Sequence, residues 1–329
     1  MENTTRLLQR HQASLLSRHV LMVGADDLGL KELTAASLHL HSDDTSLLAE
    51  QAAMLPVIEK ATDLLVVILP KSREQLAFWL ASLAGQIQAP MELWLVGASN
   101  GGVRGGVTTL KAFTDEVVQR DSARHCKLFV TTLLPADFSQ DAFEKTWPCD
   151  VFPANSTLKP FQVSSYPGVF SHGRADPGTD LLLKTLEPLT MRGSALDVGC
   201  GAGVISVVLA QKGCAVTAVD VSATAVFAAT QTVEKNGQKA SVFCSDVFNQ
   251  VQGRFDQIVT NPPFHDGTRR TTAVTQRLIE QAPQYLAARG VLWVVANQGL
   301  PYEDWLRGAF TSVEVVAENN RFRVWRAQR

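Results

Sequence analysis

The residues best suited to chemistry are Thr260-Asn261-Pro262-Pro263-Phe264, which directly follow an apolar stretch. Two prolines stop strand pairing and fix φ, so they make a rigid lip at the carboxyl end of a strand. The Asn261 side-chain carbonyl and the Pro262 backbone carbonyl can then point at one spot, and Phe264 offers a face for stacking. Two acceptors that converge on an exocyclic NH₂ orient its lone pair towards an electrophile. We take Asn261, Pro262, Pro263 and Phe264 as candidate catalytic residues; the alternative is an ordinary turn.

A glycine-rich loop precedes this lip. Asp197-Val198-Gly199-Cys200-Gly201-Ala202-Gly203 ends an apolar stretch and leads into a helical pattern. A dinucleotide fingerprint needs glycine at the first, third and sixth places, but the sixth place here is Val204. The Gly-x-Gly-x-Gly spacing instead resembles the nucleoside-binding loop of class I S-adenosylmethionine (SAM) methyltransferases, although a tight turn would also use glycines. The cofactor-binding candidates in this loop are Asp197, Gly199, Gly201 and Gly203.

Two further aspartates end expected strands. Asp220 lies 23 positions after Asp197, where a carboxylate can accept hydrogen bonds from both ribose hydroxyls. The alternative is that Asp220 caps the helix that begins near Ser222. Asp246 ends the next strand, where an adenine amino group would lie. We include Asp220, Val221, Asp246 and Val247 among the cofactor-binding candidates.

The second half of the chain alternates short apolar runs with helical patterns. The runs cover residues 195–198, 215–219, 240–243, 255–260, 291–296, 313–317 and 323–326. Such alternation predicts βαβ units and a parallel sheet with helices on both faces. The last two runs are separated only by Glu318-Asn319-Asn320, which predicts a terminal antiparallel hairpin.

The first half repeats this pattern with less order, with apolar runs at 19–23, 64–69, 93–96 and 128–134. Residues 147–155 contain two prolines and break regular structure, so we expect a linker there. A weak internal correspondence links residues 20–25 with 195–200, and residues 65–71 with 257–263. We therefore expect two α/β domains of similar shape, over residues 1–155 and 156–329.

Length and composition set wider bounds. The 329 residues exceed one ordinary domain, and 46% hydrophobic with 19% charged residues is typical of globular proteins. No stretch approaches the roughly 18–20 apolar residues needed to cross a bilayer, and the N-terminus lacks the layout of a secretory signal. The five cysteines form no CxxC pair, which argues against a zinc site and a disulfide framework. We expect a cytoplasmic protein without a metal.

The net charge of −2 requires any nucleic-acid partner to bind a local patch. Residues 161–329 carry a net charge of +2 and the first 160 residues −4, which weakly favours the second half for a polyanion. Arg321, Arg323, Arg326 and Arg329 fall within the last nine residues. They fit either a polyanion-binding surface or a solvated edge strand.

The glycine loop together with Asn261-Pro262-Pro263-Phe264-His265-Asp266-Gly267 resembles the ribosomal RNA small subunit methyltransferase C family. Residues 121–126, 167–171, 176–182 and 321–324 also resemble that family, so the resemblance spans both halves. It implies two tandem class I, Rossmann-like methyltransferase domains, of which the N-terminal one is degenerate and helps to fold the catalytic one or to orient RNA. Gly24-Ala25-Asp26-Asp27 replaces the glycine loop there, and Leu69-Pro70-Lys71-Ser72 replaces Asn-Pro-Pro-Phe.

The resemblance also implies an activity: SAM-dependent methylation of the exocyclic N2 of guanosine 1207 in 16S rRNA, within the small ribosomal subunit, by a monomer. It adds Phe170 and Thr179 to the cofactor-binding candidates. The sequence departs from the family at His172-Gly173-Arg174-Ala175-Asp176, where the family more often has an arginine-aspartate start. That departure leaves open how the 167–180 segment contacts the cofactor.

Several alternatives stay open. The target amine could instead be a guanine N2 in large-subunit RNA, adenine N6 or a protein glutamine amide, because all use the same Asn-Pro-Pro chemistry. A SAM-binding or RNA-binding chaperone without turnover is a further alternative. His265 suits a proton shuttle or local packing, and Cys200 fits between glycines because it is small. The Gly101–Gly106 cluster lacks the Lys-Ser/Thr ending of a phosphate loop, which favours a surface loop.

Overall fold

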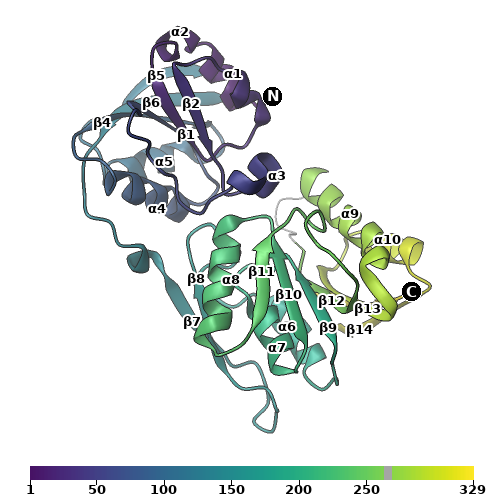
Figure 1. Cartoon of the computed structure of the whole chain (residues 1–329). Coiled ribbons are helices and arrows are strands. Elements are labelled where there is room, and N and C mark those ends of the chain that lie inside the picture. The colour runs from purple at the N-terminus through teal and green to yellow at the C-terminus, as the bar shows by residue number, and fades with distance from the viewer. Residues whose placement is uncertain (263–268) are drawn as a thin grey trace. The chain divides into compact units, whose positions relative to one another are not determined.

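The computed structural model describes residues 1–262 and 269–329. It divides into two compact units, Met1–Glu144 and Lys145–Arg329, each built on its own sheet. In Figure 1 the N-terminal unit runs from purple to teal and the C-terminal unit from teal to yellow. The prediction of two α/β domains is confirmed.

The N-terminal unit has a mixed sheet in the order β2-β1-β3-β4-β6-β5. Its strands are β1 (His19–Val23), β2 (Ser37–His41), β3 (Leu64–Ile68), β4 (Met91–Ala98), β5 (Val118–Ala123) and β6 (Cys126–Leu133). Its helices are α1 (Asn3–Gln9), α2 (Gln12–Leu15), α3 (Thr45–Leu48), α4 (Arg73–Ala84) and α5 (Val103–Leu110). Every residue of β3 is buried, as expected for a central parallel strand with both faces covered. Alternate strand residues pack against α4 and α5 on one face and against α1 on the other.

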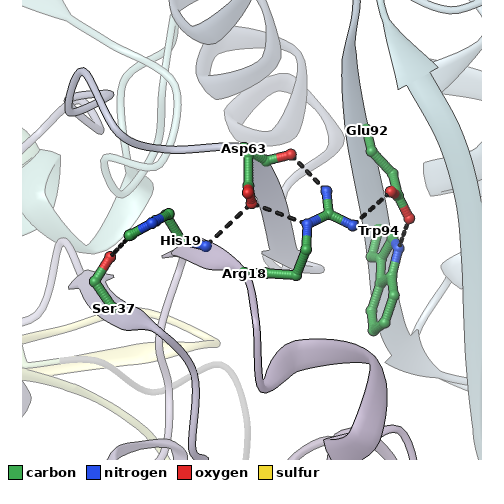
Figure 2. Close-up of polar contacts among 6 residues, drawn as sticks. All are labelled: Arg18, His19, Ser37, Asp63, Glu92 and Trp94. Atoms are coloured by element: carbon green, nitrogen blue, oxygen red, sulfur yellow. Dashed lines mark hydrogen bonds and ion pairs between the residues drawn. The ribbon is translucent and has the colours of Figure 1, made fainter.

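An arginine joins the amino ends of three strands in this unit, as Figure 2 shows. Arg18 donates from Nε to Asp63 (2.9 Å) and from a terminal nitrogen to Glu92 (2.9 Å). Burial alone would raise the pKa of Glu92, but hydrogen bonds from Trp94 and Arg18 outweigh it and lower that pKa below its usual value. The planar guanidinium reaches two carboxylates at once, which fixes the spacing of β1, β3 and β4 at this edge.

The C-terminal unit has a larger sheet in the order β11-β10-β9-β12-β13-β15-β14. Its strands are β9 (Ser194–Val198), β10 (Ala215–Asp220), β11 (Ala240–Cys244), β12 (Phe255–Thr260), β13 (Leu286–Asn297), β14 (Ser312–Glu318) and β15 (Phe322–Gln328). Strands β9 to β13 pair in parallel, and β15 pairs antiparallel with both β13 and β14. The predicted parallel sheet with a terminal antiparallel hairpin is therefore confirmed.

Helices cover both faces of that sheet. They are α6 (Pro177–Leu186), α7 (Val204–Gln211), α8 (Ala223–Lys235), α9 (Arg269–Tyr285) and α10 (Tyr302–Ala309). Leu196, Val198 and Val219 face a core shared with α9 and α10, whereas Ala218 faces α8. Because these strands pair in parallel, the carboxyl ends of β9, β10 and β12 lie along one edge of the sheet.

Part of the expected linker is instead a strand. β7 (Lys145–Cys149) pairs antiparallel with β8 (Phe161–Ser165) as a separate ribbon. Pro148 fits there because a two-stranded ribbon leaves one side of each strand without a ladder partner. The ribbon belongs to the C-terminal unit.

Candidate cofactor and amine site

The glycine loop joins β9 to α7 at the edge where the parallel strands end. Gly199, Gly201 and Gly203 all have positive φ, at 73°, 52° and 80°. A Cβ at Gly199 or Gly201 would meet nothing within 4 Å, whereas a Cβ at Gly203 would lie 2.9 Å from the Ala229 Cα on α8. The first two glycines thus face open space, and the third allows the loop to pack against a helix.

Asp220 holds this loop from the end of β10. Its carboxylate accepts a hydrogen bond from the Gly201 backbone N–H (2.9 Å) and another from the Ser222 N–H (3.0 Å). The cap of α8 is Ser222, whose hydroxyl accepts from the Ala225 N–H, so Asp220 is not the capping residue. The position beside an open glycine loop suits a ribose ligand, and that role stays a prediction.

Asp197 is completely buried under the loop. The Ser206 hydroxyl donates to one carboxylate oxygen (2.6 Å), and the other oxygen has no hydrogen-bond partner among the residues that the structure describes. Burial raises the pKa of Asp197 to about 7; the Ser206 hydrogen bond opposes this shift and the nearby Asp220 charge adds to it. A cationic ligand close to the loop would favour the ionised form of this carboxyl.

The predicted adenine end lies after β11. There the Arg277 guanidinium of α9 donates to one oxygen of Asp246. Val247 has a φ of 53°, an uncommon conformation for a β-branched residue. Strained backbone of this kind is held by its surroundings and clusters at ligand sites. Adenine contacts of Asp246 and Val247 stay predictions.

Asn261 follows β12 and lines a cavity together with Gly199 and Gly201 of the loop. Its Nδ2 donates to Asp176 (2.8 Å) and to the Thr179 hydroxyl (2.8 Å), both at the start of α6. Its side-chain oxygen is buried and accepts no hydrogen bond from any residue within 1–262 or 269–329. The next residue, Pro262, is buried. Pro263, Phe264 and His265 lie outside the described residues.

One cavity extends from the glycine loop to Asn261. Of the candidate residues it is lined by Gly199, Gly201, Asn261, Phe170 and Thr179. Val221, Asp246 and Val247 do not line it, and Asp220 adjoins it through its bond to Gly201. The cavity is also lined by polar or aromatic residues that were not among the candidates, including Trp147, Ser171, Arg174, Asp176 and Asp180. A signal for Asp176 was present: Asp-Pro-Gly-Thr is a helix start with a capping side chain and proline at the first position.

The N-terminal unit lacks the open loop. Strand register aligns Val23 with His41 on β1 and β2, as Val198 aligns with Val219 on β9 and β10. Met22 then takes the place of Asp197, and Ser42 that of Asp220. Gly24 keeps a positive φ (76°), but a Cβ there would lie 2.6 Å from the Trp79 ring. Trp79 therefore occupies the space that stays open above Gly199.

The Methyltransferase small domain family matches residues 160–326, and Methyltransferase small domain N-terminal matches residues 5–147. The Ribosomal RNA small subunit methyltransferase C of Alcanivorax borkumensis is 48% identical, with 99% of each chain covered. The Aeromonas hydrophila protein of that name is 34% identical, and the match covers 98% of this chain and 96% of the Aeromonas chain.

The chain belongs to the ribosomal RNA small subunit methyltransferase C family. The family predicted from the glycine loop and the Asn-Pro-Pro-Phe segment is confirmed. A solved T. thermophilus 16S rRNA N2 G1207 methyltransferase, in complex with AdoMet and guanosine, superimposes with a TM-score of 0.84 at 23% identity. The superposition covers all of this chain and 92% of the T. thermophilus chain, which confirms tandem methyltransferase-like folds for this member of the family.

Two further properties bear on the predictions. The described residues contain no group of three or more His, Cys, Asp or Glu side chains that could hold a metal ion. No helix among them is long and apolar enough to span a bilayer.

Proposed function

We propose that this chain methylates the exocyclic N2 of a guanine in 16S rRNA with SAM as methyl donor. The nucleotide is the equivalent of G1207, the target of the T. thermophilus enzyme. Family membership supports the substrate class. The observation that carries the chemistry is the buried Asn261 oxygen, which has no partner among the described residues and lines the same cavity as Gly199 and Gly201.

The residues around the loop fit SAM. Gly199 and Gly201 leave room for a ligand to approach the backbone, and Asp220 lies beside them as an acceptor for ribose hydroxyls. The buried Asp197 carboxylate favours a positively charged neighbour. When bound, SAM supplies a methyl group already activated by a positive sulfur, so the protein's task is to position the acceptor amine.

The Asn261 oxygen and the Pro262 carbonyl accept the two hydrogens of the guanine amine. This draws the nitrogen lone pair out of conjugation with the ring and towards the methyl carbon. The carbon–nitrogen bond forms as the carbon–sulfur bond breaks, and the amine then loses one proton to solvent. The base must leave any stack to reach Asn261, and Phe264 offers the face that receives it.

The division of labour follows the two units. The catalytic part lies in the C-terminal unit, Lys145–Arg329, and the N-terminal unit helps fold that part or orient RNA. The substrate is 16S rRNA within the small ribosomal subunit, and the enzyme acts as a monomer in the cytoplasm without a metal. The filled space above Gly24 supports a non-catalytic N-terminal half.

The test is methyl transfer from labelled SAM to small ribosomal subunits that lack the modification, followed by nucleoside analysis. N2-methylguanosine is the expected product. Methyl-adenosine, or labelled protein, would identify one of the other amino targets, and no incorporation would favour a chaperone. Asn261→Ala should cut the single-turnover rate roughly 10²–10³-fold while SAM affinity stays nearly intact, by analogy with removal of an oxyanion-hole donor. A wild-type rate in that variant would refute the acceptor role.

A further inference from the structure

Two residues at the start of α6 accept hydrogen bonds from the amide nitrogen of Asn261. Asp176 Oδ1 accepts from Asn261 Nδ2 (2.8 Å), from the Thr179 backbone N–H (2.8 Å) and from the Thr179 hydroxyl (3.2 Å). The Thr179 hydroxyl also accepts from Asn261 Nδ2 (2.8 Å). These contacts connect residues that are 85 and 82 positions apart in the chain.

Hydrogen-bonding capacity allows only one orientation of the amide. A carboxylate can only accept, so it must face the NH₂ of Asn261 rather than its oxygen. Thr179 gives its single hydroxyl hydrogen to Asp176, so towards Asn261 it too can only accept. If the amide turned over, its oxygen would face the Asp176 carboxylate, which can only accept, and its NH₂ would point at the substrate amine.

We propose that Asp176 and Thr179 are positioning residues that hold the Asn261 carbonyl towards the substrate amine. The inference rests on the proposed function, because it assigns a purpose to the orientation of the acceptor. Asp176 acts before the substrate arrives, so no binding energy is spent on turning the amide at the moment of reaction. Thr179 lines the cavity as well, and a contact between its hydroxyl and the cofactor is compatible with this role.

The ordinary alternative is that Asp176 only caps α6. It does so, through the Thr179 N–H, and Pro177 occupies the first position of the helix. A cap, however, needs no second element. The same oxygen that caps the helix also bonds Asn261 after β12, and Gly178 lies against the Phe322 ring of β15, where a Cβ would come within 3.1 Å. The start of α6 thus packs against β15 and holds the amide of Asn261.

Asp176→Asn separates the two roles. Asparagine caps helices about as well as aspartate, so α6 should keep its start. Its side chain can present NH₂ as well as oxygen, so it no longer dictates how Asn261 faces. We expect a single-turnover rate, at saturating SAM and RNA, lower on the order of tenfold, since a bond to a charged group is lost. Asp44→Asn, the same change at the cap of α3, is the matched control and should leave the rate unchanged.

Thr179 offers a conservative rescue. Thr179→Val keeps the shape but removes the hydroxyl, and should slow transfer to a similar degree, whereas Thr179→Ser keeps the hydroxyl and should restore most of the rate. SAM affinity, measured in parallel by calorimetry, separates this effect from a lost cofactor contact.

The deciding readout is coupling to Asn261. Because Asp176 acts through that amide, Asp176→Asn should cost little further rate in an Asn261→Ala background. Additive losses, or a wild-type rate in Asp176→Asn, would overturn the positioning role even if Asn261→Ala is slow. A fast Asn261→Ala would instead remove the acceptor role on which the inference depends, so the two failures are distinguishable.

Discussion

Two carboxylates beside the glycine loop differ in their burial and their hydrogen bonds. Asp220 accepts hydrogen bonds from the backbone N–H groups of Gly201 and Ser222. Asp197 is sealed beneath the loop with a single hydroxyl donor, and its pKa is raised to about 7. Asp197 is therefore costly to the fold when ionised. We predict that ribose hydroxyls are bound by Asp220 and not by Asp197.

This difference predicts how stability depends on pH. The folded-state pKa of Asp197 lies above its unfolded value, so its stabilising contribution is complete below pH 4 and is lost as pH rises towards 7. Asp197→Asn removes that loss. Relative to wild type, the variant should gain on the order of 4 kcal/mol in unfolding free energy between pH 4 and 8. Urea titrations of both proteins across that range check this, and a difference that does not vary with pH would contradict it.

Removing Asp220 should act on the cofactor. Asp220→Ala deletes the acceptor beside Gly201 and should weaken SAM binding by about 1.5–3 kcal/mol, the value of hydrogen bonds to a charged group. Calorimetry measures the change, and thermal unfolding without SAM reports whether the loop itself has loosened. Unchanged affinity would exclude Asp220 from the site.

The sequence located several residues that line the cavity, where those residues lie in short contiguous motifs. Asn261, Gly199 and Gly201 fall in short segments whose spacing predicts their use. Asp176 and Arg277 were missed because their partners, Asn261 and Asp246, are 85 and 31 positions away, and only the packing of α6 and α9 brings them together. Side-chain spacing along a chain does not encode such contacts.

At the scale of elements, apolar runs located most of the buried strands. β2 and β5 were missed because neither is an apolar run: β2 contains two histidines, and β5 reads Val-Gln-Arg-Asp-Ser-Ala with most of its side chains exposed. Both are edge strands, which need no apolar residues on both faces. Part of β7 was taken for a linker because Pro148 lies in it.

The glycine loop offers a contrast within one element. Gly201 and Gly203 both have positive φ, so alanine strains the backbone at either position. At Gly203 the new Cβ also meets α8 at 2.9 Å, whereas at Gly201 it projects into open space. Gly203→Ala should therefore lower the unfolding free energy more, by about 1–3 kcal/mol from overpacking. Gly201→Ala should instead mainly weaken SAM binding.

Denaturant unfolding and calorimetry on the same two variants separate these effects. We expect the two variants to rank in opposite order in the two measurements. Gly203→Ala should be the less stable protein, and Gly201→Ala should lose more SAM affinity relative to its loss of stability. Equal effects of both variants on both measurements would mean that the open space above Gly201 is not where SAM binds.

At the scale of the whole molecule, two units of one architecture differ in what lies over the first glycine of the loop. In the N-terminal unit, the Trp79 indole donates to the Met54 carbonyl (3.2 Å) and packs edge-on against His41, whose ring is buried. Burial lowers the pKa of His41 to about 4, so the ring is neutral at pH 7. A neutral aromatic pair fills the position where a cofactor would need space and an acidic partner.

The full chain should therefore bind one SAM and not two. Calorimetric titration of the intact protein should give a stoichiometry near one. Asp220→Ala should weaken that single site and reveal no second site of wild-type affinity, because Ser42 replaces the acidic residue in the N-terminal unit and Trp79 occupies the space over Gly24.

Trp79→Ala is the companion variant. It should destabilise the N-terminal unit by about 3–5 kcal/mol as a buried aromatic is lost, yet leave the stoichiometry at one, since Met22 and Ser42 supply no carboxylate. A stoichiometry of two in either protein would show that the duplicated half still binds the cofactor.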